Sequence, residues 1–331
     1  NEHKPPLVRV WHYTTHGPVV SSPVVANDLV YIGSRDHTLY ALDAQRGSEH
    51  WKMETGDQIE ATPLIIDGLV CVGSHDGSLY AADAMSGELR WSTRFGHAIR
   101  SSAVGLDGRV FVADHSGTVM AISADAGRVL WHAATRGEVT AGLALGERAL
   151  ICGSWDGSLY AFDVDDGRLL WQFVADGAIA ATPTVWANMV CCGSDDANVY
   201  AIDLASGKVR WRRPVGGYTR ASAAVSDELF VVGSHDGRVY GLEHETGEVA
   251  WRAETEDQIL ASGTVSGDVV YLGSIDGALY AIRLSDGEII WKHKTLYGIY
   301  SSPAIVGRML YVGIEHYDVA AFTANNEPTA T

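Results

Sequence analysis

The sequence predicts an all-β fold in which one four-stranded unit recurs eight times around a ring. The first observation is a set of tryptophans spaced 40 residues apart without insertion or deletion, namely Trp11, Trp51, Trp91, Trp131, Trp171, Trp211, Trp251 and Trp291. A fixed period of about 40 residues is typical of a repeat architecture. The second observation is that each repeat contains short β-type runs with turn residues between them. The third is that the first and last repeats are incomplete in complementary ways.

The second repeat shows the four expected strands most clearly. We expect strands over Ala61–Ile66, Leu69–Gly73, Ser78–Asp83 and Glu88–Thr93. Asp67-Gly68 separates the first two, and Gly or Asp residues also separate the others. Short apolar and β-branched runs between such turns predict an antiparallel meander. The repeat has no helical periodicity.

Recurring glycines and aspartates are expected to maintain this unit rather than to carry out chemistry. Gly73, which ends the second strand, and Gly87, which precedes the fourth, both suit a backbone with positive φ. Asp76 lies in a tight turn, where a short carboxylate accepts hydrogen bonds from backbone N–H groups. A calcium loop is not expected, because its alternating acidic ligands are missing from the sequence. The periodic tryptophans are expected to pack one unit against the next.

The two ends of the chain complement each other. Val8–Tyr13 supplies a fourth strand without the preceding three, and Ser301–Phe322 supplies three strands without a fourth. Pairing them would complete the eighth unit and remove an open sheet edge. The sequence therefore predicts an eight-bladed β-propeller of four-stranded antiparallel blades, closed by its N-terminal strand. We expect a single domain over residues 8–323, with tails at residues 1–7 and 324–331.

Composition limits the classes of partner. The 331 residues include 24 Lys and Arg against 41 Asp and Glu, which gives a net charge of −17. This negative field disfavours nucleic acid and anionic membrane surfaces as partners. The sequence has no apolar run of about 18 residues, so no membrane span is expected. We expect a monomer.

The four cysteines fall in the second strand of their repeats, where other repeats carry Tyr, Ile, Val, Phe or Leu. They are Cys71, Cys152, Cys191 and Cys192. Cysteine is often a buried apolar residue, so we expect free buried thiols rather than disulfides or metal ligands. Unpaired thiols favour a reducing, cytoplasmic compartment.

Candidate binding residues gather on one face of the predicted ring. In a meander, the loop after the fourth strand and the turn between the second and third strands lie on the same face, and the loop borders the central channel. Constant positions maintain the fold, so polar positions that vary between repeats are where a site can be placed. The predicted ligand-binding residues are Asp57, Gln58, Glu60, His97, Arg100, Glu138, Thr140, Tyr218, Arg220, Asp257, Gln258, Tyr297 and Tyr300. The predicted protein-contact residues on the turns are His75, His115, Trp155 and His235.

Arg100 and Arg220 are the strongest individual candidates in this set. A guanidinium fork recognises carboxylate or phosphate. The alternative for both is a salt bridge to Glu60 or Glu138 inside the channel. His97 paired with either glutamate would form an acid–base pair. The turn histidines are not expected to share a metal, because blade six lies too far round the ring from blades two and three.

The repeat resembles that of the PQQ-like, or quinoprotein-type, β-propellers. The segments that carry the resemblance read LYALDAQRGSEHW, LYAADAMSGELRW, LYAFDVDDGRLLW and VYAIDLASGKVRW, and it covers about residues 8–323. This family includes quinone-dependent alcohol dehydrogenases, BamB-type lipoproteins that scaffold outer-membrane protein assembly, and sensor domains of bacterial kinases. The resemblance implies a bacterial protein in an extracytoplasmic location, whereas the thiols favour the cytoplasm, so the compartment stays open.

The dehydrogenase members imply the quinone PQQ, a calcium ion, a catalytic Asp and a disulfide between adjacent cysteines. Cys191-Cys192 is the one matching element, and it lies inside the predicted strand MVCCGS, whereas a ring of two adjacent cysteines needs a turn. No calcium or base position carries over to this sequence. We therefore predict no cofactor and no metal.

The leading functional hypothesis is a non-catalytic binding or scaffold module, whose channel rim binds a protein segment or a small anionic ligand. The alternative is an enzyme acting in the central funnel, either as a quinone-dependent oxidoreductase or without a cofactor. Its catalytic residues would come from Arg100, Arg220, Tyr218, Tyr300, His97, Glu60 and Glu138. A third hypothesis is a structural spacer within a longer exported protein.

Overall fold

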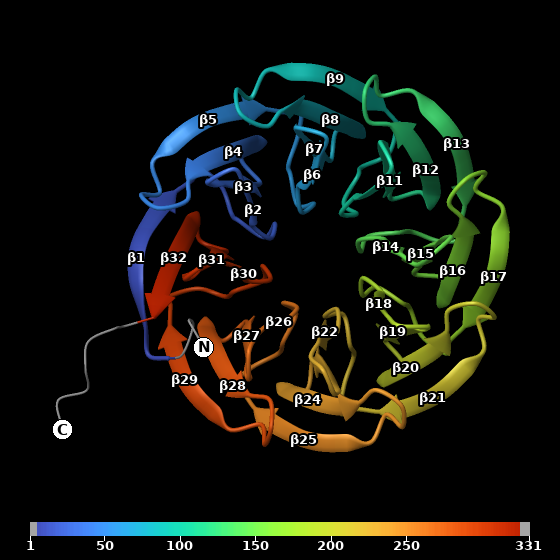
Figure 1. Cartoon of the computed structure of the whole chain (residues 1–331), viewed down its shortest axis with the longest axis vertical. Helices are drawn as coiled ribbons and strands as arrows, with labels where there is room; N and C mark the ends of the chain where they lie inside the picture. Colours follow the sequence, from blue (N-terminus) through green and yellow to red (C-terminus); the bar gives the residue numbers. More distant parts are fainter. Residues whose placement is uncertain (1–4, 325–331) are drawn as a thin grey trace.

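The computed structural model describes residues 5–324, which form eight four-stranded sheets. The sheets are arranged as blades around a central axis (Figure 1). All pairings within the blades are antiparallel, as the three strand pairings of the second blade illustrate. Over the described residues all assigned elements are strands, and no helix is long and apolar enough to cross a membrane. The predicted eight-bladed, all-β architecture is confirmed.

Strand position within a blade follows chain order, with one exception. The innermost strands are β2 (Val24–Ala26), β6 (Leu64–Ile66), β10 (Val104–Leu106), β14 (Ala144–Leu145), β18 (Thr184–Trp186), β22 (Ala224–Val225), β26 (Thr264–Ser266) and β30 (Ala304–Val306). The second strands are β3 (Leu29–Gly33), β7 (Leu69–Gly73), β11 (Arg109–Ala113), β15 (Ala149–Gly153), β19 (Met189–Gly193), β23 (Leu229–Gly233), β27 (Val269–Gly273) and β31 (Met309–Ile314). The third strands are β4 (Thr38–Asp43), β8 (Ser78–Asp83), β12 (Thr118–Ser123), β16 (Ser158–Asp163), β20 (Asn198–Asp203), β24 (Arg238–Glu243), β28 (Ala278–Arg283) and β32 (Asp318–Ala324). The outermost strands are β5 (Glu49–Glu54), β9 (Leu89–Arg94), β13 (Val129–Ala134), β17 (Leu169–Val174), β21 (Val209–Pro214), β25 (Val249–Glu254), β29 (Ile289–Lys294) and, as the exception, β1 (Leu7–Thr14).

The exception closes the ring. Strand β1 pairs with β32, from Leu7 opposite Ala324 to Thr14 opposite Asp318. In Figure 1 the blue N-terminal strand lies along the red C-terminal strand of the eighth blade. The predicted closure by the N-terminal strand is confirmed. Of the predicted tails, residues 1–4 and 325–331 lie outside the described residues.

The inner strands are shorter than predicted. Strands β7 and β8 have the predicted bounds, but β6 lacks the first three residues of the predicted Ala61–Ile66. The backbone N–H of Thr62 donates instead to Ser102 Oγ of the next blade, at 3.0 Å, and Pro63 has no N–H to donate. These residues therefore bond across the blade interface rather than within their own sheet.

The periodic tryptophans link each blade to the next. Trp51 donates its indole N–H to the carbonyl of Ala84, 3.0 Å away in the following blade. The same contact is made by Trp11, Trp91, Trp131, Trp171, Trp211 and Trp251. Gly87 lies under the Trp51 ring at φ +72°, and a Cβ there would come 2.6 Å from the indole. The predicted packing role of the tryptophans is confirmed. Position 87 requires glycine both because its φ is positive and because a Cβ would clash with the indole.

The glycine at the end of each second strand has a different role from the predicted one. Gly73 does not have a positive φ, so that expectation was wrong. A Cβ on Gly73 would lie 2.2 Å from Cγ2 of Ile99, a fully buried residue of the next blade. The position is occupied by glycine because two blades approach closely there, and not because of its backbone conformation.

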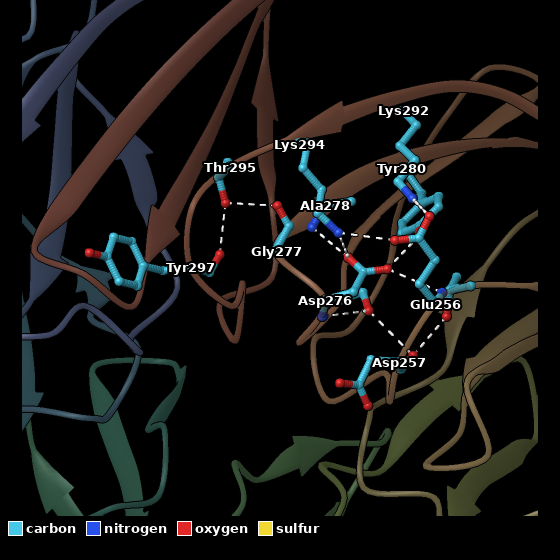
Figure 2. A network of polar contacts seen from close by, with 12 residues as sticks. Glu256, Asp257, Asp276, Gly277, Ala278, Tyr280, Lys292, Lys294, Thr295 and Tyr297 are labelled. Carbon is cyan, nitrogen blue, oxygen red and sulfur yellow. Dashed lines mark hydrogen bonds and ion pairs between the residues drawn. The ribbon is translucent and has the colours of Figure 1, made fainter.

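The aspartate turns connect neighbouring blades, as Figure 2 shows for blade seven. Asp276 Oδ1 accepts from the backbone N–H of Ala278 at 2.6 Å. Its Oδ2 accepts from the Tyr280 hydroxyl at 2.5 Å and from the backbone N–H of Glu256, in the loop leaving blade six, at 3.2 Å. Asp36, Asp76, Asp156 and Asp196 repeat this arrangement. The predicted turn role of these aspartates is confirmed.

Candidate functional site

The loops that enter each blade and the turns between second and third strands meet at one end of the ring, which we call the rim face. Backbone hydrogen bonds hold turn and loop together, for example from His75 N to the carbonyl of Gln58 at 2.9 Å and from Trp155 N to that of Glu138 at 2.9 Å. Each turn residue therefore lies beside a loop residue of its own blade. These hydrogen bonds fix the backbone positions from which the rim side chains extend.

Three blades contribute to an arginine–glutamate network on this face, formed by Arg35, Glu60, His75 and Arg100. Arg35 lies in the turn of blade one, whereas Glu60 and Arg100 enter blades two and three. Arg35 contacts Glu60 Oε1 through Nε at 2.8 Å and Nη2 at 2.7 Å. Arg100 contacts Oε2 through Nε at 2.9 Å and Nη2 at 2.7 Å. The salt bridge to Glu60, which was the alternative for Arg100, is formed.

The carboxylate at the centre of this network is held in its charged form. The Glu60 side chain is 11% exposed. Burial by itself raises the pKa of Glu60, but His75 at 3.4 Å and the charges of Arg100 and Arg35 outweigh it and lower the pKa to about 2. Glu60 is therefore an anchor for two guanidinium groups, and it holds no proton to donate at neutral pH.

A second cluster, the aromatic–arginine patch, consists of Trp155, Asp195, Tyr218 and Arg220. Arg220 binds both carboxylate oxygens of Asp195, through Nε at 3.0 Å and Nη2 at 2.7 Å. Its guanidinium lies 5.0 Å from the Trp155 ring centre and 6.0 Å from that of Tyr218. The indole N–H of Trp155 donates to Thr140 Oγ1 at 2.8 Å. These contacts fix aromatic side chains that stay 41% exposed at Trp155 and 51% exposed at Tyr218.

The aromatic–arginine patch extends over the rim of blade five, which has small side chains. Trp155 belongs to blade four and Arg220 to blade six, so their contact passes over the rim of blade five. The rim positions of blade five are Gly177, Ala178 and Ala180. Small residues there leave room for the indole. His235 lies 5.9 Å from the Tyr218 ring, and burial together with the charge of Arg220 lowers the pKa of His235.

The predicted acid–base pair of His97 with Glu60 or Glu138 is not formed. His97 Nδ1 lies 3.8 Å from Oδ2 of Asp114, a carboxylate that is 1% exposed, whereas the His97 side chain is 66% exposed. Glu138 instead contacts His115 Nε2 at 3.4 Å. Asp114 was not predicted as a partner of His97, because six of the other seven repeats carry serine at that position and the eighth carries Ile314.

The remaining predicted site residues lie at separate points of the rim. Asp57 and Asp257 each accept the backbone N–H of the following glutamine, Gln58 or Gln258, at 2.7 Å. In Figure 2 the carboxylate of Asp257 and the ring of Tyr297 both point away from the Asp276 network. The ring of Tyr297 stacks on the ring of His316, with 3.8 Å between the two ring centres. Burial raises the pKa of Tyr300, which is half-buried.

Two residues that complete the clusters, Arg35 and Asp195, were not predicted as site residues. A regular signal could have identified them. Arg35 and Glu60 are 25 residues apart, and so are Asp195 and Arg220. This offset joins the turn of one blade to the rim of the next, so opposite charges at that spacing predict a contact.

The residues present do not fit the quinone and calcium site of the dehydrogenases. Within residues 5–324, no group of three or more His, Cys, Asp or Glu side chains is placed to hold a metal ion. Cys191 and Cys192 are free and buried in β19. They belong to different hydrophobic clusters, on opposite sides of the sheet, so a disulfide ring between them is not formed. The prediction of free buried thiols is confirmed.

Comparison with known proteins gives two family matches. Residues 106–326 match the model described as the β-propeller of the beta-alanine-activating enzyme. Residues 8–104 match the model described as outer membrane protein assembly factor BamB. No curated protein matches the chain.

Solved structures share the fold at low sequence identity. The computationally designed Ika8 protein is 18% identical, with a TM-score of 0.86 over 95% of this chain and 99% of that one. BamB from Moraxella catarrhalis is 21% identical, with a TM-score of 0.84 over 96% and 99%. The quinohemoprotein alcohol dehydrogenase ADHIIG from Pseudomonas putida HK5 is 14% identical, with a TM-score of 0.82 over 98% and 77%. At such identities the likeness shows the fold alone.

Proposed function

The chain belongs to the β-propeller family of the beta-alanine-activating enzyme, and from this premise we propose that it is a non-catalytic module whose rim face binds a segment of a partner protein. It is a PQQ-like β-propeller. The family model that residues 8–104 match is named for an outer membrane protein assembly factor, which supports a role in contacting other proteins. Fold by itself does not decide function, so the proposal depends on the rim residues.

The observation that carries the proposal is the aromatic–arginine patch. Trp, Tyr and Arg are the residues most enriched among those that dominate protein–protein binding energy. Trp155 is fixed by Thr140 and Arg220, and Arg220 by Asp195. Side chains that are already ordered lose little conformational entropy on binding. The patch therefore combines exposed aromatic area with a geometry that exists before a partner arrives.

The chemistry of the patch defines the segment it fits. Arg220 and Asp195 neutralise each other, and the pKa of His235 is lowered, which favours its neutral form at neutral pH. We infer a segment with an apolar or aromatic side chain that packs against the Trp155 indole, bordered by polar backbone groups. The pKa of Glu60 in the arginine–glutamate network is lowered, so Glu60 holds no proton to donate at neutral pH. That network therefore gives no support to an acid–base enzyme.

Selection of random peptides displayed on phage, against wild type and against W155A in parallel, tests the proposal. We expect a peptide family that is enriched on wild type and depleted on W155A. Leu89, which is 49% exposed on the outermost strand of blade two, provides the control: the L89A variant should enrich the same family. Recovery of the same peptides on W155A as on wild type would refute the assignment to this patch.

A further inference from the structure

The arginine–glutamate network contains more positive charge than it neutralises. Two guanidinium groups share the single carboxylate of Glu60, and His75 is the other group in contact with it. The aromatic–arginine patch differs, because Arg220 and Asp195 pair one to one. Within the network itself, two guanidinium charges therefore face one carboxylate charge.

Both guanidinium groups also have unused hydrogen-bond donors. Arg35 and Arg100 each contact Glu60 through Nε and Nη2. Within residues 5–324 neither Nη1 group has an acceptor. Each guanidinium has five N–H donors in a planar fork. The side chains of Arg35 and Arg100 are 35% and 39% exposed, so these donors can be reached from solvent.

We propose that Arg35 and Arg100 form a binding site for the oxyanion group of a small ligand, a phosphate or a carboxylate, with Glu60 as the positioning residue between them. The two oxygens of one carboxylate hold one guanidinium each, so both guanidinium groups are fixed on the same side chain. An oxyanion with two or more oxygens can then bridge their free edges with charge-assisted hydrogen bonds. This site is distinct from the aromatic–arginine patch and uses none of its residues.

Isothermal titration of wild type with inorganic phosphate, and separately with succinate, tests this proposal. We expect saturable binding of at least one of the two, and the preferred anion identifies the group. R35Q and R100Q should each weaken the affinity about tenfold or more, equivalent to about 1.4 kcal/mol. R100K keeps the charge but loses the fork, so its affinity should lie between wild type and R100Q.

The matched control is R90Q, which removes an arginine that pairs with Asp83 and Glu88 away from the rim face. R90Q should bind the anion as wild type does, and circular dichroism should show that every variant is folded. The proposal is overturned if neither anion binds saturably, or if R35Q and R100Q bind as tightly as R90Q. Peptide selection against W155A has a separate readout, so failure of anion binding leaves the proposed function intact.

Discussion

At the scale of single residues, Glu60 contacts three basic side chains on the rim face. Two arginines from neighbouring blades and one histidine contact its two oxygens. These contacts exist only when the ring is assembled, because the partners come from blades one, two and three. The charged form of Glu60 is therefore favoured in the folded state over the unfolded state, and this preference makes stability depend on pH.

We predict that Glu60 stabilises the fold above pH 4.5 and loses this effect as the pH falls. Its folded pKa of about 2 is below the usual 4.5, so the stabilisation is complete above 4.5 and disappears toward 2. The contribution is on the order of 3 kcal/mol. Denaturant unfolding of wild type and E60Q across this range should show a steeper acid loss for wild type.

The control for this measurement is Glu254, which pairs with Arg238 and is 71% exposed. Exposed ion pairs contribute little to stability. E254Q should therefore keep the steep acid dependence of wild type. If E60Q also kept it, the network would not be the source of the pH dependence.

At the scale of elements, the contacts between blades decide which residues are tolerated. In blade two Gly73 faces Ile99 of blade three. In blade three the equivalent pair is Ala113 and Val139, which lie in one hydrophobic cluster. Ala113 thus replaces the glycine, and the residue opposite it is the smaller Val139 in place of isoleucine.

We predict that G73A destabilises the protein by about 1–3 kcal/mol, the usual cost of overpacking a core. The new Cβ would meet Ile99 Cγ2 at 2.2 Å. Because Ala113 coexists with Val139, the double variant G73A/I99V should recover part of the loss. Urea unfolding of the two variants and of I99V alone gives the comparison. A G73A protein as stable as wild type would show that the approach of the blades is not tight.

The strand pattern could be predicted from the sequence because it depends on local signals. Apolar runs and Gly or Asp turns set the bounds of β7 and β8. The inner strands were overextended because Thr62 bonds to Ser102 of another blade, which no local pattern reveals. The Gly73 position was misinterpreted for a similar reason, since its neighbour Ile99 belongs to the next blade.

The candidate site was predictable only in part. The salt bridge of Arg100 was an alternative that the sequence left open between Glu60 and Glu138, and the structure forms it with Glu60. The contact between Trp155 and Arg220 passes over a whole blade. It depends on side-chain conformations and on the small rim of blade five, which sequence spacing does not give. The partner of His97 was missed because Asp114 stands where most other repeats carry serine.

At the scale of the whole molecule, one strand pairing closes the ring. Strand β1 completes the blade that also contains β30, β31 and β32. Without β1, the edge of β32 and the apolar cluster that includes Leu7 and Phe322 would be exposed. Exposed strand edges promote aggregation.

We predict that a chain lacking residues 1–13 aggregates or melts well below wild type. The control is a circular permutant in which residues 7–14 follow Ala324. Leu7 already lies opposite Ala324 in an antiparallel pair, so a short turn would join the two strands as a hairpin. The permutant should melt close to wild type in calorimetry. A truncated chain with an unchanged melting temperature would contradict the closure mechanism.

The rim of this closed ring presents two chemically different sectors. The arginine–glutamate network lies over blades one to three, and the aromatic–arginine patch lies over blades four to six. The fold holds both at fixed positions on one face. We propose that the second sector binds a protein segment.

Titration calorimetry of the best selected peptide into wild type, W155A and L89A shows whether the aromatic–arginine patch is the binding site. We predict that W155A weakens binding about tenfold or more, because hot-spot residues contribute on the order of 2 kcal/mol or more. L89A should bind as wild type does. Equal affinities for wild type and W155A, with all proteins folded, would contradict the claim that this patch is the binding site.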